Sequence, residues 1–224
     1  MWRFSTILFL GFGFCAEPAS ARNVKVYPLT VSIHELVKST LDQAAVEAIL
    51  ARASDLLQGH GSAADTSNNC SVGFKLKGRL TTFSSAPADI GTLSDLEKAH
   101  SVPADVKVVR SINFCVNEFS RDGFIGCSWR PNRNVAKTII VTPPDVMGDD
   151  LQHIVWVHEF GHTTGLLHRT QSDEMHLMTA CEIELFNRQI NANECRHFVA
   201  GPVQHFPSNL GRACPLRSSG KVID

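Results

Sequence analysis

The spacing of apolar positions along the chain predicts several β-strands. Residues 23–33 are rich in β-branched and aromatic side chains with partial alternation, which predicts a first strand. Residues 72–83 and 105–114 share this character and predict two more. The residues between these two segments, 84–101, are small and polar, which is typical of a long surface loop.

Two further strands are expected in the second half of the chain. Residues 121–131 combine an Asp-Gly turn and a proline with apolar Phe124 and Ile125, which predicts a short edge strand. Residues 135–142 are largely apolar and end at a pair of prolines, so they predict another strand.

In three segments the apolar residues are spaced as in an amphipathic helix. Residues 41–58 carry an amphipathic pattern with an aspartate near its start and a glycine just beyond its end. A second helix is predicted to open at Asp149 and Asp150, either of which can cap it, and to run to about residue 165. A third helical pattern covers about 193–199.

Composition indicates an ordinary globular chain. Of its 224 residues, 43% are apolar and 19% charged, which is enough to bury a core. The formal net charge is −1 and no long Lys or Arg run occurs, so neither nucleic acid nor an anionic membrane is an expected partner. Repeats and low-complexity tracts are absent, so residues 22–224 are expected to form one domain.

The N-terminus resembles a secretory signal peptide. Arg3 precedes a mostly apolar run at 4–15, and the small residues Ala19-Ser20-Ala21 follow it. The alternative, a membrane anchor, is disfavoured because the run is shorter than the roughly 20 residues that span a bilayer. We expect cleavage after Ala21, a secreted or periplasmic protein, and no membrane association afterwards.

The cysteines are expected to form disulfides. Cleavage removes Cys15 and leaves an even set, which in an exported chain predicts three disulfides of open connectivity. No CxxC pair occurs, so a cysteine-bound zinc or a thioredoxin-like site has no support. The candidates are Cys70, Cys115, Cys127, Cys181, Cys195 and Cys214.

The sequence HEFGHTTGLLH, at residues 158–168, has the spacing of a zinc site. His158 and His162 lie one helical turn apart, so both imidazoles can bind one ion. Gly165 can take a left-handed conformation and turn the chain out of the helix, which brings His168 to the same ion. Glu159 is displaced round the helix and suits a general base better than a ligand.

Three imidazoles leave zinc with an open position for water, as catalytic sites require. A single histidine is more often an ordinary surface or core residue, but chance occurrence of the whole pattern is on the order of one in ten thousand. We therefore expect one catalytic zinc, with Glu159 accepting a proton from the attacking water and returning it to the leaving amine.

These eleven residues resemble the zinc signature of the metzincin metallopeptidases. The resemblance predicts a methionine turn downstream, for which Met178 is placed ten residues after His168. The short spacing is most similar to matrixins and related bacterial enzymes, whereas Arg169 matches no major subfamily. The resemblance implies an α+β fold with a twisted mixed sheet and two long helices. The zinc helix would lie below an edge strand, and an irregular C-terminal part would contain the methionine turn and a last helix.

The same resemblance implies a secreted, monomeric endopeptidase acting on protein or peptide. Met178 would form an apolar floor beneath the zinc, and the following residues, among them Thr179 and Ala180, would wall the substrate pocket. The edge strand around Phe124 and Ile125 would pair with extended substrate.

Several features depart from family patterns. Some metzincins carry a tyrosine two residues after the methionine, but position 180 is Ala180 and the chain's one tyrosine is Tyr27. The negative charge on the oxygen of the tetrahedral intermediate would then be stabilised mainly by zinc, with a smaller contribution from His176. The first strand follows Ala21 almost directly, so an inhibitory pro-segment is not expected.

Calcium is a further possible ligand that the sequence does not support. The available aspartates lack EF-hand spacing, and turn or capping roles explain them more simply. They are Asp122, Asp145, Asp149 and Asp150.

Two rival functions stay open. A zinc-carrying binding protein without turnover would keep the three histidines, but it would not need Glu159 beside an open position. A zinc hydrolase of a non-protein amide would use the same motif and the same chemistry.

Overall fold

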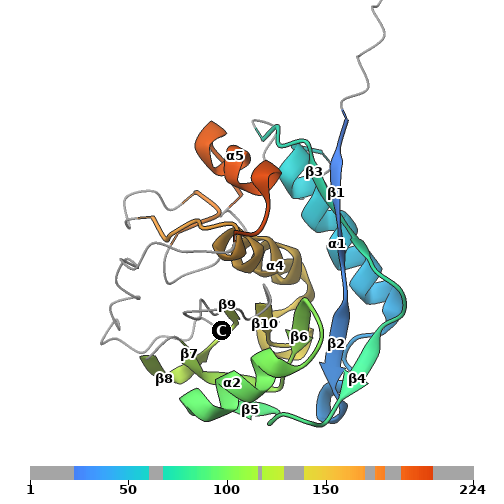
Figure 1. The fold of residues 1–224 in the computed structure, drawn as a ribbon, viewed down its shortest axis with the longest axis vertical. Coiled ribbons are helices and arrows are strands. Elements are labelled where there is room, and N and C mark those ends of the chain that lie inside the picture. The colour runs from blue at the N-terminus through green and yellow to red at the C-terminus, as the bar shows by residue number, and fades with distance from the viewer. Residues whose placement is uncertain are drawn as a thin grey trace, which may run out of the picture.

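The computed structural model describes residues 23–60, 68–115, 118–128, 139–169, 175–179 and 188–203. Helices pack on a twisted, mixed β-sheet, so the predicted α+β fold class is confirmed (Figure 1). The five-stranded sheet has the order β4-β2-β6-β10-β9, with β9 antiparallel at one edge and the other pairs parallel. In that order the strands are Thr81–Phe83, Val31–His34, Val106–Val108, Ile139–Val141 and Gly126–Ser128.

Two smaller sheets flank this one. Strand β1 (Lys25–Leu29) pairs in parallel with β3 (Val72–Leu76). Strand β7 (Ser111–Cys115) pairs with β5 (Asp89–Ile90) on one side and antiparallel with β8 (Glu118–Phe124) on the other. A short 3-10 helix, Glu35–Val37, follows β2.

Two long helices, α1 (Gln43–Gln58) and α4 (Asp149–Thr163), pack on one face of the five-stranded sheet and enclose the main core. Helix α1 has the predicted ends: the Asp42 carboxylate accepts from the Ala45 N–H at 2.8 Å, and Gly59 ends the helix at φ 71°. Burial of each large aliphatic side chain in this core contributes about 1.5–3 kcal/mol.

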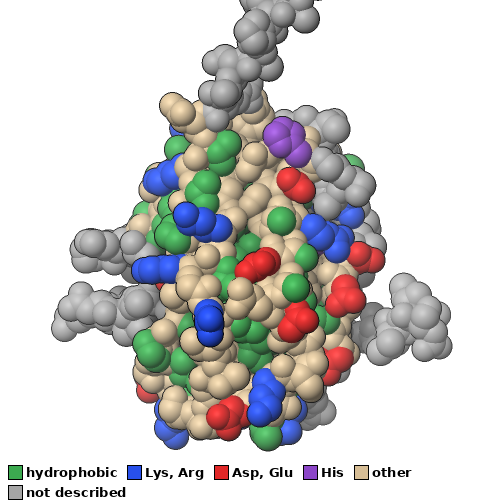
Figure 2. Space-filling view, turned by 90° about the vertical axis from the view of Figure 1, so that its right-hand side faces the viewer, with side chains coloured by type: hydrophobic (Ala, Val, Ile, Leu, Met, Phe, Trp, Pro, Cys, Tyr) green, Lys and Arg blue, Asp and Glu red, His purple; other side chains and the backbone are tan. Residues whose placement is uncertain are grey.

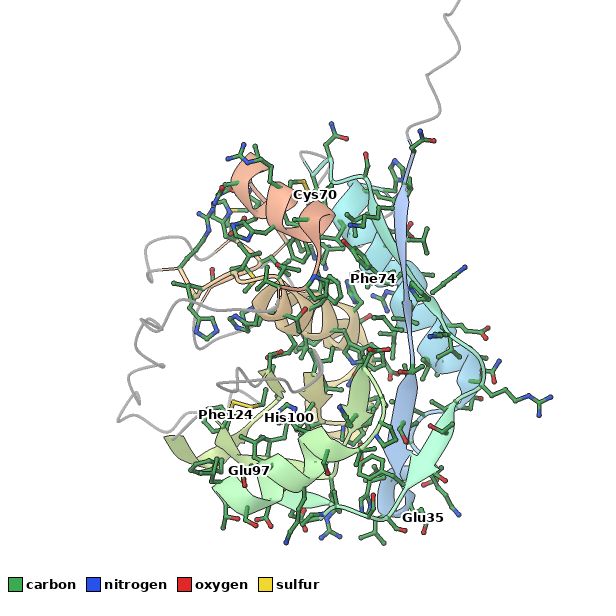
Figure 3. The ribbon with its side chains drawn as sticks, in the orientation of Figure 1. Glu35, Cys70, Phe74, Glu97, His100 and Phe124 are labelled. Carbon is green, nitrogen blue, oxygen red and sulfur yellow. A yellow bond between two sulfur atoms is a disulfide. The ribbon has the colours of Figure 1, made fainter. Side chains whose placement is uncertain are left out.

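The predicted loop at 84–101 was wrong, because it contains strand β5 and helix α2 (Leu93–Ser101). The Thr92 hydroxyl accepts from the Asp95 N–H and caps this helix. Leu96 and Ala99 are buried in a second, smaller core on the opposite face of the five-stranded sheet. Figure 3 shows α2 with the side chains of Glu97 and His100 labelled.

Four predicted strands are each divided in two. The first breaks at Thr30, whose N–H and hydroxyl both donate to the Asp105 carboxylate, at 2.8 and 2.6 Å. The second breaks near Gly78, which has a φ of 77°. The third divides into β6 and β7, and the fourth into β8 and β9, and in both cases the two parts enter different sheets.

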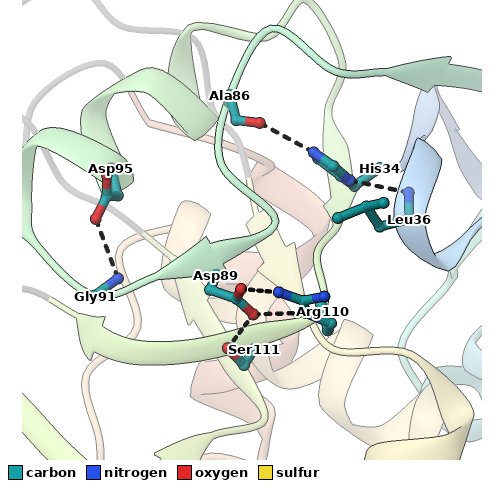
Figure 4. A network of polar contacts seen from close by, with 8 residues as sticks. All are labelled: His34, Leu36, Ala86, Asp89, Gly91, Asp95, Arg110 and Ser111. Carbon is teal, nitrogen blue, oxygen red and sulfur yellow. Dashed lines mark hydrogen bonds and ion pairs between the residues drawn. The ribbon is translucent and has the colours of Figure 1, made fainter.

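A polar network joins β5 to the start of β7 (Figure 4). The Asp89 carboxylate accepts from Arg110 Nε at 2.9 Å and from the Ser111 hydroxyl at 2.7 Å. The hydrogen bond from Arg110 holds the pKa of Asp89 below its usual value. In the same region His34 donates from Nε2 to the Ala86 carbonyl and accepts the Leu36 N–H at Nδ1.

The ends of the remaining helices correct one prediction. Helix α4 follows a short helix α3 (Pro144–Met147), and its N-cap is Gly148 without a side-chain cap, so neither Asp149 nor Asp150 caps it. Both aspartates lie in its first turn instead, where negative charge is favourable. Helix α5 (Ala192–Ala200) begins with a capping box made by its Asn191 cap and Glu194.

Two disulfides are present in the described residues. One joins Cys70 to Cys195 and ties the start of β3 to α5, and the other joins Cys115 of β7 to Cys127 of β9. Cys181 and Cys214 lie outside the described residues, so the third predicted disulfide stays a prediction.

We expect the double variant Cys70→Ala/Cys195→Ala to lose about 4 kcal/mol of unfolding free energy, because this bond closes a long loop. The two cysteines are 125 residues apart in the sequence. Urea unfolding of the two proteins measures the loss. Equal midpoints and slopes would contradict the assigned pairing.

Lys, Arg, Asp and Glu side chains are interspersed over the face that carries α1 and β3 (Figure 2), in keeping with the near-zero net charge. Within the described parts of the chain, no helix is both long and apolar enough to cross a membrane.

Candidate metal centre

The three predicted histidines meet in one place. His158 and His162 project from α4 with 2% and 8% of their surfaces exposed, and His168 approaches from the segment after the helix. Their Nε2 atoms are mutually 3.0–3.1 Å apart. Within the described residues, no other set of three or more His, Cys, Asp or Glu side chains could hold a metal ion.

Hydrogen bonds fix which nitrogen faces the centre. His158 donates from Nδ1 to the Leu177 carbonyl at 2.7 Å, and His162 donates from Nδ1 to the Leu166 carbonyl at 2.9 Å. A carbonyl only accepts, so each Nδ1 carries the proton and each Nε2 of the neutral ring presents a lone pair. Two lone pairs 3.1 Å apart repel each other, whereas a cation between them would bind both.

The nitrogen triangle fits a tetrahedral zinc ion. Zinc–imidazole bonds of about 2.0–2.1 Å place two ligand nitrogens about 3.3 Å apart, close to the separations here. Carbonyl partners on Nδ1 are also the usual outer contacts of zinc-binding histidines, because they orient the ring. The residues present therefore fit zinc, with three protein ligands and one position left for water.

The site favours neutral imidazole. Burial and, to a smaller extent, the neighbouring His168 lower the pKa of His158 to about 3, although the hydrogen bond to the Leu177 carbonyl acts in the opposite direction. His158 is therefore neutral at physiological pH, as a metal ligand must be.

The turn after α4 brings His168 back to the helix. Gly165 has a φ of 92°, which favours glycine, and the Leu166 N–H donates to the Gly161 carbonyl at 3.1 Å. Beyond His168, the Arg169 guanidinium pairs with the buried Glu194 carboxylate of α5 at 2.7 Å. The third histidine is thus held between α4 and α5.

Met178 lies in a turn against helix α4. The Thr179 N–H donates to the His176 carbonyl at 3.1 Å, which closes the turn, and Met178 itself is fully buried. A Cβ at Gly161 would lie 2.6 Å from the Met178 sulfur, so only glycine lets this side chain pack so closely. The Arg169 N–H donates to the Met178 carbonyl and joins the turn to the third histidine.

Glu159 follows His158 in α4, and its side chain lies against strand β9. Its side chain is 5% exposed, and the Ser128 hydroxyl donates to its main-chain carbonyl at 2.7 Å. The structure therefore places a carboxylate and three imidazoles on adjoining parts of one helix and its turn.

The predicted substrate contacts are spread more widely. Phe124 ends β8 and packs against the second core (Figure 3), while the Ile125 carbonyl accepts from the Thr142 N–H. Thr179 is buried and pairs with Arg169 through the backbone. Ala180 lies outside the described residues.

Sequence reasoning missed two features of the site. Gly126 lies against the Glu159 side chain, and Glu194 pairs with Arg169. Arg169, which matches no major metzincin subfamily, indicated that a carboxylate partner was needed. Nothing in the sequence indicated which carboxylate that was. Gly126 carried no local signal.

We expect His153 of α4 to lower stability in acid. Its ring is fully buried, and burial, together with the nearby Arg52 and Arg188, lowers its pKa to about 4 despite the opposing effect of Asp150. In the unfolded chain this histidine is protonated as pH falls below about 6.5, whereas in the native state it stays neutral until about pH 4. Protonation therefore favours the unfolded state, and the unfolding free energy falls by about 2 kcal/mol between pH 7 and 5.

Urea unfolding at pH 7 and 5 checks this for the wild type and His153→Leu, with exposed His60→Leu as the control. His153→Leu should lose about 2 kcal/mol less than the wild type between the two pH values, and the control should follow the wild type. An undiminished fall in His153→Leu would contradict the expectation.

Comparison with known proteins identifies no family. No known protein family matches the sequence, and no curated protein matches it either. Among solved structures, metalloproteinase-II from Bacteroides fragilis is similar, with 12% identity, a TM-score of 0.46, and coverage of 82% of this chain. The match spans 55% of that enzyme's chain, and similarity at this level assigns no activity.

Proposed function

We propose that this protein is an exported, zinc-dependent endopeptidase of metzincin type. The observation that carries the proposal is the triangle of Nε2 lone pairs on His158, His162 and His168, with the buried Glu159 next to His158 on the same helix. A purely structural zinc site uses four protein ligands, whereas three ligands and an adjacent carboxylate suit hydrolysis. The two disulfides fit an oxidising compartment outside the cytoplasm.

When bound, zinc supplies Lewis acidity to the scissile carbonyl and lowers the pKa of the water that attacks it. His158, His162 and His168 hold the ion as neutral ligands. Glu159 takes the proton of the attacking water on its carboxylate and passes it to the nitrogen of the departing amine. Its burial beneath β9 keeps the carboxylate away from bulk solvent.

Extended polypeptide is the proposed substrate. Among the described residues β9 pairs only with β10, at the edge of the five-stranded sheet, and it lies against Glu159, so its outer side can pair with a substrate strand. In this arrangement the scissile bond would lie between β9 and the three histidines. A protein or peptide therefore suits the site better than a small amide.

Zinc content and digestion of an unfolded protein test the proposal together. The mature protein should bind about one zinc per chain and cleave a reduced, alkylated protein substrate. Chelation should abolish cleavage, and stoichiometric zinc should restore it. Full activity after complete removal of the metal would contradict the proposal.

A further inference from the structure

Strand β9 makes two contacts with Glu159 from one face. Gly126 and Ser128 are two residues apart, so both face α4. A Cβ at Gly126 would lie 2.5 Å from Glu159 Oε1, 2.7 Å from its Cγ and 2.8 Å from its Cδ. The Ser128 hydroxyl donates to the Glu159 carbonyl at 2.7 Å.

The glycine at 126 is required for space and not for backbone freedom. Gly126 is absent from the set of glycines with a positive φ, so another residue could adopt its conformation. Any Cβ there would overlap the Glu159 side chain, which is 5% exposed. The overlap would be relieved by moving the carboxylate.

Strand β9 is itself firmly held. It pairs with β10, where Gly126 lies opposite Val141 and Ser128 opposite Ile139. Between the two contact residues, Cys127 points to the other face of the sheet, into the second core, and its disulfide to Cys115 ties β9 to β7. These contacts restrain the position of β9. A larger side chain on the strand would therefore displace the Glu159 side chain and not the strand.

We propose that Gly126 and Ser128 are positioning residues for Glu159. Gly126 leaves the space that the carboxylate occupies and limits how far the carboxylate can move towards β9. Ser128 fixes the helical main chain from which the carboxylate extends. The consequence for catalysis rests on the proposed function, in which Glu159 must stay within hydrogen-bonding reach of the attacking water.

The catalytic test is Gly126→Ala in the zinc-loaded mature protein. A displaced base should lower kcat by about 100-fold, with KM within a few-fold and zinc content unchanged. Gly91→Ala is the matched control, because a Cβ there lies 3.9 Å from Asp95 Oδ2 and meets nothing closer. Wild-type kcat in Gly126→Ala would overturn the inference.

A double-mutant cycle on thermal stability tests the contact without any peptidase activity. Gly126→Ala should lower Tm by about 5 °C in the wild type and by much less in Glu159→Ala, where the obstructing side chain is gone. Equal Tm shifts in both backgrounds would overturn the inference. If the wild type proves inactive, the proposed function fails while this cycle still decides the positioning claim.

Ser128→Ala gives an independent measurement if Gly126→Ala does not fold. Loss of the hydroxyl should lower kcat by about 10-fold while zinc content stays the same. An unchanged kcat in Ser128→Ala would remove Ser128 from the proposal.

Discussion

Glu159→Gln should lower kcat/KM by about 1000-fold and leave zinc content unchanged. Glutamine has nearly the shape of glutamate, so it can occupy the same space beneath β9. Its amide cannot accept a proton from water at neutral pH, so the step that activates the attacking water is lost. A peptide substrate found by library digestion, with metal analysis of the same sample, gives both quantities.

The matched control for this variant is Glu97→Gln, an exposed glutamate on α2 (Figure 3), which packs in the second core and not in the one that contains α4. It removes the same charge without touching the site, and its activity should equal that of the wild type. Activity of Glu159→Gln within a few-fold of the wild type would exclude Glu159 as the base.

His162→Ala should weaken zinc binding by at least about 1000-fold. Changes to partners in the outer shell typically cost about 10–100-fold in affinity, and the loss of a direct ligand costs more. The variant should also lose the rise in Tm that zinc gives the wild type, because an ion bound only by the native state stabilises it. Competition with a chelator of known affinity, followed by thermal unfolding with and without zinc, measures both effects.

Exposed His60→Ala is the control for this measurement. It should keep the zinc affinity of the wild type. If His162→Ala bound zinc as tightly as the wild type, the ion would lie elsewhere and the assigned ligand set would be wrong.

The cluster of three histidines was predictable because its geometry is local. His158 and His162 share a helix face through their spacing alone, and Gly165 turns the chain back within a few residues. The ends of α1 were predictable for the same reason, since Asp42 and Gly59 act on the adjoining turns.

Features that depend on distant partners were not predictable. Thr30 breaks the first strand through Asp105, and the pairing of Cys70 with Cys195 joins residues 125 positions apart. Lys107 occupies a central strand, where burial lowers its pKa to about 7, although nothing in its neighbours' sequence marks it as buried.

Helix α2 was missed because its pattern is short and weak. Only nine residues long, it has a polar exposed side that resembles a loop, and its stability depends on the Thr92 cap and on burial of Leu96 in the second core. Gly126 was missed because the side chain that it accommodates, Glu159, comes 33 positions later and meets it only after β9 folds over α4.

Digestion of one peptide library by zinc-loaded wild type and by zinc-loaded Glu159→Gln tests the central claim most directly. Mass spectrometry of the products should find new peptide termini with the wild type and almost none with the variant, each protein carrying about one zinc. Equal numbers of new termini would contradict the role of Glu159. No new termini with either protein would instead support a zinc-carrying binding protein and contradict the peptidase proposal.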